Sequence, residues 1–364
     1  MYFEISRKEL LNPLKMVTSV VEQRQTLPIL GHLLMRVKDQ TLQLTATDSE
    51  VEIACSLPLT ETSQDDETTV PKKIFDIVRS LPENSQIQVT SADSHIIVKS
   101  GKSRFTLSCL PAQDFPESPQ IQGAEFQIAA SLFKKLVSKT AFCVAVNDVR
   151  YYLTGLLLEI ADNKMSLVGT DGHRMAVAEC SFETPETTKV IIPRKAVFEL
   201  LKLIPESENN IKISVNDAHI KFELSDSLVM SSKLIDGSFP DWRSVVPYGA
   251  DKIVLAQTAL LKQALARVSL LSNEKYKGVK LSLLENSMVI NARNPQQEEA
   301  TEELPVEYQG EEMEVGFNGV YITEALNVIS TPGAKLAFSE PQASVLMTEE
   351  ETDDYKWIIM SMRL

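Results

Sequence analysis

The sequence is poor in the residue patterns that build metal centres and disulfide frameworks. Its 364 residues include four cysteines and four histidines, which are scattered and form no Cys-x-x-Cys pair. Isolated cysteines are typical of reduced thiols in a cytosol rather than of a disulfide framework or a zinc ribbon. We therefore expect no metal and no cofactor.

Long apolar runs are also lacking. None approaches the roughly 18 consecutive residues that a membrane-spanning helix requires. The first residues, Met1 to Glu4, do not have the basic and then apolar order of a signal peptide. We expect a cytoplasmic protein without a membrane partner.

Three segments of the chain follow one plan. Each begins with a helix-period stretch, runs to a glycine, and continues as two alternating strands joined by a short polar turn. The glycines, Gly31, Gly155 and Gly278, are separated by 124 and 123 residues. The turns lie at 38–40, 162–164 and 285–287. Further helices open at Pro71 and Pro193, where a proline in the first turn costs no hydrogen bond.

This repeat predicts an α+β fold of three similar domains, each with two helices packed on antiparallel sheets. The predicted domains are residues 1–122, 123–248 and 249–364. A unit of this size, about 121 residues, can bury its own core. The alternative, three unrelated domains with chance similarity, is disfavoured because the helix, the glycine and the turn recur in step.

Acidic residues outnumber basic ones, 50 against 36, for a net charge of −14. The predicted helices reverse this balance, with 14 basic and 5 acidic residues, which leaves −23 on the rest of the chain. These helices are residues 7–22, 71–80, 131–142, 193–204, 258–271 and 318–330. Lysine favours helices, but glutamate does so equally and is scarce here. A basic helical surface is typical of polyanion binding, here by backbone contact rather than base reading.

Five separated strings carry a family resemblance across the whole chain. They are TLPILG at 26–31, DVRYYL at 148–153, TDGHR at 170–174, SNEK at 272–275 and MRL at 362–364. With these strings the sequence resembles the bacterial sliding clamps, the beta subunits of DNA polymerase III. The resemblance implies a head-to-tail homodimer that closes as a ring around duplex DNA, without sequence specificity and without a catalytic step.

The resemblance also implies partners. A clamp loader would open the ring, and the replicative polymerase alpha subunit and other clients with clamp-binding motifs would dock in a peptide-binding cleft. The residues at matching cleft positions are Leu153, Thr170, Gly172, His173, Arg174, Met175, Pro240, Val245, Asn318, Tyr321, Ser344, Met360, Ser361, Met362 and Arg363. Two serines differ from a well-known member of the family, which has a proline at the position of Ser361 and an arginine at that of Ser244.

The string 170–174 has a second interpretation, because Asp171 and His173 could be an acid/base pair. No G-x-S-x-G nucleophile context accompanies them, and Asp171-Gly172 is typical of a turn. The chain end also has two interpretations. Met360 and Met362 place adaptable apolar side chains where varied peptides could bind, or they complete an edge strand.

Other positions match the DNA contacts of the family or lie on the basic helices. They are Arg24, Lys72, Lys73, Lys134, Lys135, Lys139, Asn147, Tyr151, Tyr152, Arg194, Lys195, Lys262 and Arg267. Each lysine could equally be a solvated surface charge, and Tyr151-Tyr152 could be a strand with one ring in the core.

For the dimer contact, the resemblance pairs an edge of the first domain with an edge of the third. The matching positions are Lys102, Arg104, Phe105 and Leu107 on one side, and Leu270, Leu271, Glu298, Glu299 and Glu302 on the other. Basic against acidic, with an apolar centre, is a plausible interface. The acidic run 296–303 could also be a solvated strand end. The rival function is a three-domain peptide-binding scaffold without topological linkage to DNA.

Overall fold

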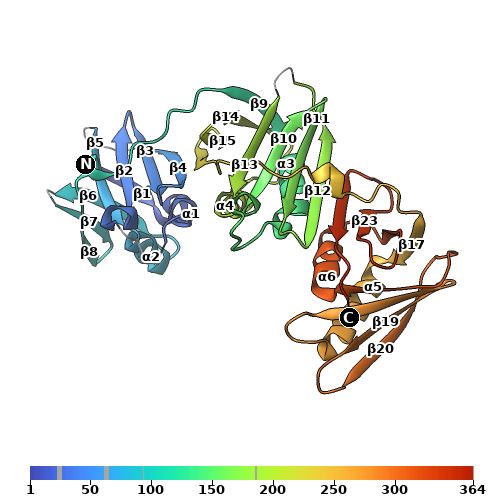
Figure 1. The fold of residues 1–364 in the computed structure, drawn as a ribbon. Helices are drawn as coiled ribbons and strands as arrows, with labels where there is room; N and C mark the ends of the chain where they lie inside the picture. Colours follow the sequence, from blue (N-terminus) through green and yellow to red (C-terminus); the bar gives the residue numbers. More distant parts are fainter. Residues whose placement is uncertain (23–26, 61–64, 93, 185–186, 364) are drawn as a thin grey trace. The chain divides into compact units, whose positions relative to one another are not determined.

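The structure, a computed structural model, describes residues 1–22, 27–60, 65–92, 94–184 and 187–363 (Figure 1). The chain divides into two compact units, residues 1–134 with 198–234, and residues 135–197 with 235–364. Among the described residues, each unit contains one eight-stranded and one four-stranded antiparallel sheet. The fold is α+β, as predicted.

In the first unit the eight-stranded sheet has the order β5-β2-β3-β4-β16-β15-β14-β9 and the four-stranded sheet the order β1-β6-β7-β8. The strands of the larger sheet are β2 (His32–Lys38), β3 (Thr41–Thr47), β4 (Val51–Pro58), β5 (Asp66–Pro71), β9 (Ala124–Ala129), β14 (Asn210–Val215), β15 (His219–Ser225) and β16 (Leu228–Lys233). Those of the smaller sheet are β1 (Tyr2–Ser6), β6 (Gln86–Ala92), β7 (His95–Ser100) and β8 (Ser103–Ser108).

The second unit repeats this plan with the orders β13-β10-β11-β12-β24-β23-β22-β17 and β20-β19-β18-β21. The strands of the larger sheet are β10 (Gly155–Ala161), β11 (Lys164–Thr170), β12 (Arg174–Ser181), β13 (Thr188–Pro193), β17 (Lys252–Gln257), β22 (Gly333–Phe338), β23 (Val345–Glu349) and β24 (Tyr355–Ile359). Those of the smaller sheet are β18 (Gly278–Leu284), β19 (Ser287–Arg293), β20 (Glu299–Pro305) and β21 (Met313–Asn318).

The helices follow the sequence prediction with shorter ends. The α-helices are α1 (Arg7–Thr18), α2 (Lys73–Ser80), α3 (Ala130–Thr140), α4 (Arg194–Leu203), α5 (Thr258–Val268) and α6 (Gly319–Val328). The short 3₁₀ helices are η1 (Pro28–Gly31), η2 (Ala112–Asp114), η3 (Ala141–Cys143), η4 (Tyr151–Leu153), η5 (Trp242–Val245) and η6 (Ser269–Leu271). The predicted helices 131–142 and 258–271 were too long because η3 and η6 tighten their last turns.

Local chemistry explains where these elements begin and turn. Ser6 and Glu9 form a capping box that starts α1, since the Ser6 hydroxyl accepts from the Glu9 N–H and the Glu9 carboxylate accepts from the Ser6 N–H. The β10–β11 hairpin turns at Asp162 and Asn163, both with positive φ, as two-residue hairpins require. Gly155 starts β10 where a Cβ would lie 2.5 Å from the Ile191 side chain.

The eight-stranded sheets each join strands from two successive thirds of the chain. Strand β4 of the first third pairs with β16 of the second, and β12 of the second pairs with β24 of the third. The compact units therefore cut across the sequence repeat. On the sheets, α1 packs against β3, β4 and α2, and α5 packs against β19, β20 and α6.

Candidate functional site

The loop between β11 and β12 is a tight, hydrogen-bonded turn. Asp171 Oδ1 accepts from the backbone N–H groups of His173 (2.9 Å) and Arg174 (3.0 Å). The Thr170 hydroxyl donates to the Arg174 carbonyl and accepts from the Gly172 N–H. Gly172 has φ +84°, a conformation that favours glycine. The Asp171 carboxylate thus serves the turn rather than the imidazole of His173.

Arg174 ties this loop to helix α6. Its Nε lies 3.1 Å from Asp171 Oδ2, and its Nη1 pairs with Glu324. A third bond runs from Nη2 to the Phe142 carbonyl, at 3.0 Å. The guanidinium carbon stacks 4.4 Å from the Tyr321 ring centroid. Arg174 is therefore fixed from several sides, and the loop with it.

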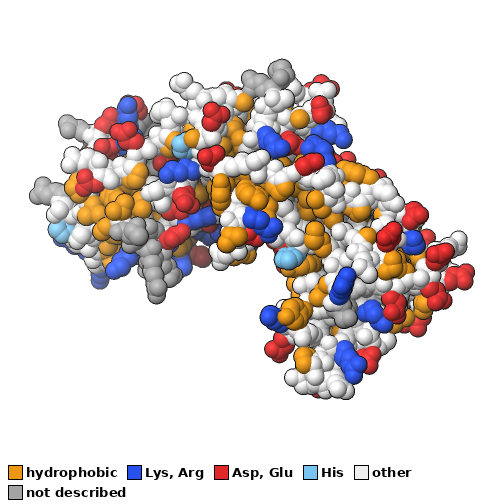
Figure 2. Space-filling view, in the orientation of Figure 1, with side chains coloured by type: hydrophobic (Ala, Val, Ile, Leu, Met, Phe, Trp, Pro, Cys, Tyr) orange, Lys and Arg blue, Asp and Glu red, His pale blue; other side chains and the backbone are white. Residues whose placement is uncertain are grey.

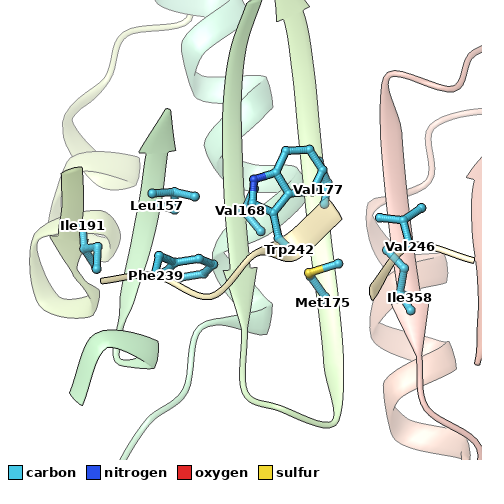
Figure 3. Close-up of a cluster of buried hydrophobic side chains, with 9 residues drawn as sticks. All are labelled: Leu157, Val168, Met175, Val177, Ile191, Phe239, Trp242, Val246 and Ile358. Carbon is cyan, nitrogen blue, oxygen red and sulfur yellow. The ribbon is translucent and has the colours of Figure 1, made fainter. Parts of the chain in front are cut away.

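An apolar pocket of about 220 Å³ opens beside the loop. Its lining residues are Arg150, Leu153, Thr170, Gly172, Arg174, Met175, Phe239, Pro240, Trp242, Val245, Ile358 and Met360. Figure 3 shows the segment that carries Phe239 and Trp242 crossing in front of the sheet strands that carry Leu157 and Val168. Apolar walls with a few polar groups at the rim are typical of a ligand-binding pocket.

Trp242, in this pocket wall, is anchored through a buried carboxylate. Its Nε1 donates to Glu159 Oε2 at 3.2 Å, and Arg243 Nη1 pairs with the same oxygen at 2.7 Å. The Arg243 guanidinium also stacks on the indole, 4.2 Å from the ring. Burial opposes the Glu159 charge, but Arg243 outweighs it and lowers the pKa of Glu159. The pocket wall is therefore preorganised.

A second pocket, of about 290 Å³, adjoins the first through Met360, which lines both. Its other lining residues are His173, Lys275, Tyr276, Asn318, Tyr321, Ser361 and Met362. The chain end is fixed here because the Met362 N–H donates to the Gly316 carbonyl at 2.8 Å. The Ser361 hydroxyl donates to the Gln342 carbonyl at 2.7 Å. Strand β24 ends at Ile359, so the last residues extend beyond the sheet.

The structure gathers most of the predicted cleft residues in these two pockets. Ser344 lines neither pocket. Arg363 lines a third pocket, which lies on the sheet that contains β18 and β19. Sequence reasoning missed six lining residues: Arg150, Phe239, Trp242, Lys275, Tyr276 and Ile358. A Phe-Pro pair also occurs at Phe115-Pro116, at the equivalent point of the first third of the chain, and Lys275 lies in one of the resemblance strings, so the sequence held a signal for both positions.

Comparison with known proteins decides the family. Models of the DNA polymerase III beta subunit match residues 1–119 with the N-terminal domain, 127–241 with the central domain and 243–363 with the C-terminal domain. The chain belongs to the DNA polymerase III beta subunit family, the bacterial sliding clamps. The beta sliding clamps of Pseudomonas putida and Escherichia coli K12 are each 42% identical to it, over 100% of both chains.

Solved structures of sliding clamps agree over the full length. The Pseudomonas aeruginosa clamp bound to griselimycin has a TM-score of 0.97 at 42% identity, and Caulobacter crescentus pol III beta has 0.93 at 32%, with 100% of each chain covered. The fold is thus the clamp fold. The function is that of a DNA sliding clamp, a processivity factor rather than an enzyme, and the scaffold alternative is not favoured.

The predicted DNA-contact positions of this sliding-clamp chain differ in their surroundings. Lys73, Lys135, Lys262, Asn147 and Tyr151 are exposed. Exposed side chains of this kind can reach a phosphate, although the Lys135 ammonium also lies 4.9 Å from the centroid of the Tyr355 ring.

Several other predicted DNA contacts already have partners. Lys134 pairs with Glu206 at 2.9 Å, and Lys72 Nζ donates to the Val21 carbonyl at 2.6 Å. Arg194 Nη1 donates to a backbone carbonyl, that of Val144, at 2.8 Å. Burial lowers the pKa of Arg194. Lys195 and Tyr152 are partly buried.

Arg267 and Glu302 were predicted for different surfaces, DNA and dimer. They form an ion pair with each other, in which Arg267 Nε lies 2.9 Å from Glu302 Oε2. Because both side chains remain partly exposed, the pair has modest strength and either member can still meet an outside partner. Arg24 lies outside the described residues.

Lys139 corrects the sequence prediction, because its side chain is only 4% exposed. Its Nζ donates to Glu349 Oε1 and Ser330 Oγ, each at 2.6 Å, and to the Val328 carbonyl. An ammonium has three protons to donate, so none is left for a phosphate. Lys139 therefore supports the fold and does not line a DNA channel.

Two other kinds of site are absent from the described residues. There, no three or more His, Cys, Asp or Glu side chains gather as a metal site would require. No helix in the same part of the chain has the length and apolar character needed to cross a bilayer.

Proposed function

We propose that two copies of this chain close head-to-tail into a ring around duplex DNA in the cytoplasm. A clamp loader opens this ring, which then holds the polymerase alpha subunit and other clients through the two adjoining pockets. Each copy contributes three domains, residues 1–122, 123–248 and 249–364. The full-length similarity to the beta sliding clamps of Pseudomonas putida and Escherichia coli supports this assignment.

The observation that carries the proposal is a pair of sheet edges that have no partner strand among the described residues. Within the chain, β4 pairs with β16 and β12 pairs with β24, each over five residues. By their place in the repeat, β20 corresponds to β4 and β12, and β8 corresponds to β16 and β24. Both β8 and β20 are terminal strands of their four-stranded sheets. Pairing β20 of one copy with β8 of another would repeat the internal junction and remove both edges.

The internal junction also gives the expected register. At the first junction Leu228 faces Cys55 and Ser232 faces Val51. Transferring this pairing through the matching hairpins places Ser103 opposite Glu302, Phe105 opposite Ala300, and Leu107 opposite Glu298 of the other copy. Arg104 then lies diagonally between Glu299 and Glu303, close enough for opposite charges to attract.

Burial supports this pairing. Met230, in β16, is 0% exposed, and it lies opposite Ile53 of β4 in the internal junction. Its counterpart Phe105 in β8 is only half-buried in the single chain, as is Leu107. Leu270, in η6 above the β20 edge, is 81% exposed. Apolar side chains left open at both edges indicate a surface that a second copy covers.

The DNA contact follows from the same arrangement. The exposed Lys73, Lys135 and Lys262, together with Asn147 and Tyr151, provide phosphate-binding groups that are few and separate. Such binding is weak and salt-sensitive, which lets a protein slide. A closed ring does not depend on tight binding, and it raises the effective concentration of a tethered polymerase at the template.

The decisive experiment tests topological linkage. The protein is loaded with a clamp loader onto a nicked circular plasmid, washed in high salt, and the circle is then cut once. We expect retention on the circle and release on cutting. Equal loss from circular and linear DNA, with an active loader, would mean that the protein binds only the DNA surface.

The cleft proposal makes a separate prediction. Deleting residues 360–364 removes Met360 and Met362 from the two pockets but leaves both sheet edges intact. We expect client-peptide affinity to fall at least a hundredfold, because the apolar contacts and the shared wall are lost. Fluorescence anisotropy with a polymerase-derived peptide measures this, and sedimentation checks that the dimer persists. Unchanged peptide affinity would show that the cleft is misassigned.

A further inference from the structure

A third pocket continues the cleft onto the outer face of the sheet that contains β18 and β19. It encloses about 570 Å³ and shares Tyr276 and Met362 with the second pocket. Its remaining lining residues are Asn273, Gly278, Lys280, Asn291, Ala292, Arg293 and Arg363. We call it the β18–β19 pocket. Met360 and Met362 thus link three pockets into one track along the end of the chain.

The charge of this track is opposite to that of the chain. No Asp or Glu side chain lines the second pocket or the β18–β19 pocket, whereas His173, Lys275, Lys280, Arg293 and Arg363 do. The whole chain carries a net charge of −14. Figure 2 shows Lys and Arg side chains around the C-terminus. A local excess of basic groups on an acidic protein favours an acidic ligand.

Of these basic groups, the nearest carboxylates neutralise only Lys280. Glu314 accepts from Lys280 at 2.9 Å, and Glu299 accepts from the Asn291 amide at 2.6 Å. Within the described residues, Lys275, Arg293 and Arg363 form no ion pair. Arg293 Nη2 reaches only the Gln297 amide oxygen, at 3.3 Å.

The local backbone presents these groups in fixed positions. Asn273 Oδ1 accepts from the backbone N–H groups of Lys275 (2.9 Å) and Tyr276 (3.1 Å), which fixes the backbone from which both side chains extend. The Lys275 ammonium lies 5.1 Å from the Tyr276 ring centroid. Met362 is anchored to β21 through the Gly316 carbonyl. The backbone of the track is therefore fixed before a ligand arrives, which limits the backbone entropy lost on binding.

We infer that the β18–β19 pocket binds Asp or Glu side chains that flank the apolar motif of a client peptide. The inference rests on the proposed client cleft and extends it. Apolar residues of the peptide occupy the first pocket, a polar residue the second, and the acidic flank reaches Lys275, Arg293 and Arg363. Clients with an acidic flank would then be preferred over clients with a neutral or basic one.

Matched synthetic peptides test this inference. Each fluorescein-labelled peptide is the same polymerase-derived client peptide, extended by three Asp or by three Asn residues, with the flank at either end. At low salt we expect one Asp-flanked peptide to bind about fivefold more tightly than its Asn-flanked partner, and the difference to shrink in high salt. The variant with Lys275→Gln and Arg293→Gln should lose this difference. The control Lys164→Gln, an exposed lysine at the start of β11, should keep it.

The outcomes separate the inference from the proposed function. If both Asn- and Asp-flanked peptides bind equally at either end, the cleft stands and the acidic preference is wrong. If neither binds, the client cleft itself fails, and the inference with it. A single-stranded oligonucleotide provides a further comparison. If it displaces the Asp-flanked peptide but not the Asn-flanked one, at a concentration below that of the peptide itself, then nucleic acid is the ligand of the pocket and the inference is overturned.

Discussion

Replacing Leu270 and Leu271 by alanine is expected to raise the dissociation constant of the dimer about a hundredfold. Leu270 is 81% exposed in the single chain, beside an open strand edge. Burying it and the half-buried Leu271 against a second copy would stabilise the dimer by roughly 1.5 kcal/mol each. The sum, about 3 kcal/mol, corresponds to that change in affinity.

Sedimentation velocity over a dilution series measures the effect. The matched control is Val146→Ala with Val149→Ala, which truncates two apolar side chains that are 67% and 98% exposed. Both lie in the segment between η3 and η4, which belongs to neither β8 nor β20. The control should remain a dimer at concentrations where the leucine variant is monomeric. If the leucine variant also remained a dimer at nanomolar concentration, the proposed edge pairing would be wrong.

A charge exchange tests the register itself. Arg104→Glu should weaken the dimer, because it places a carboxylate beside Glu299 and Glu303 of the other copy. Adding Glu299→Arg should recover a large part of the loss, since it restores an opposite-charge pair across the junction. Absence of recovery in the double variant would indicate a different register.

The repeat was readable from the sequence because its signals are local. A hairpin turn such as Asp162-Asn163 and the alternation in the flanking strands involve residues only a few positions apart. The same holds for the 170–174 loop, whose hydrogen bonds connect near neighbours in the chain. Turn chemistry at such positions depends little on the rest of the fold.

The sequence did not reveal that two successive thirds of the chain share each eight-stranded sheet. Alternation shows which side chains of β4 face the core, but it does not show that β16, from the next third of the chain, is the neighbouring strand. The repeat indicated three similar domains, but it did not indicate that successive thirds of the chain share a sheet, which is why the compact units cut across the repeat. Strand partners distant in the sequence are set by packing, which periodicity does not describe.

Lys139 shows a different kind of failure. A lysine in a helix with few acidic residues was interpreted as one of a set of surface charges. Its spacing from Leu136, three positions away, places it on the apolar face of α3, so a signal existed. What the sequence did not reveal was the partner, because Glu349 lies 210 positions later.

Replacing Lys139 by methionine should lower the free energy of unfolding by about 3 kcal/mol at neutral pH. The ion pair with Glu349 joins two side chains that are each 4% exposed. Ser330 also donates to Glu349, and the Tyr355 ring centroid lies 5.0 Å from the ammonium. Removing the lysine leaves a buried carboxylate without its counter-ion, which is among the costlier single changes in a protein core.

The pH dependence identifies the cause. Burial opposes the charged form of Glu349, but the bonds from Lys139 and Ser330 outweigh it, and the pKa of Glu349 is lowered from 4.5. In the native chain this group therefore stabilises the fold above pH 4.5, and the contribution is lost as the pH falls through the lowered pKa. In Lys139→Met the pKa of Glu349 should instead rise above 4.5, so the cost should shrink as the pH falls through the raised value.

Urea unfolding followed by tryptophan fluorescence suits this test, since Trp242 and Trp357 both lie in the second unit, and the Trp357 indole N–H donates to the Lys139 carbonyl. Lys139→Met with Glu349→Met should recover most of the lost stability, because no buried charge remains. The control Lys262→Met, on the exposed side of α5, should change the free energy of unfolding by less than about 0.5 kcal/mol.

A Lys139→Met protein as stable as the native one at pH 7 would show that the pair does not hold the fold. If instead stability falls while retention on a closed circle of DNA is unchanged, Lys139 acts inside the protein and not on the DNA, since a lysine with no proton left to donate has no phosphate contact to lose.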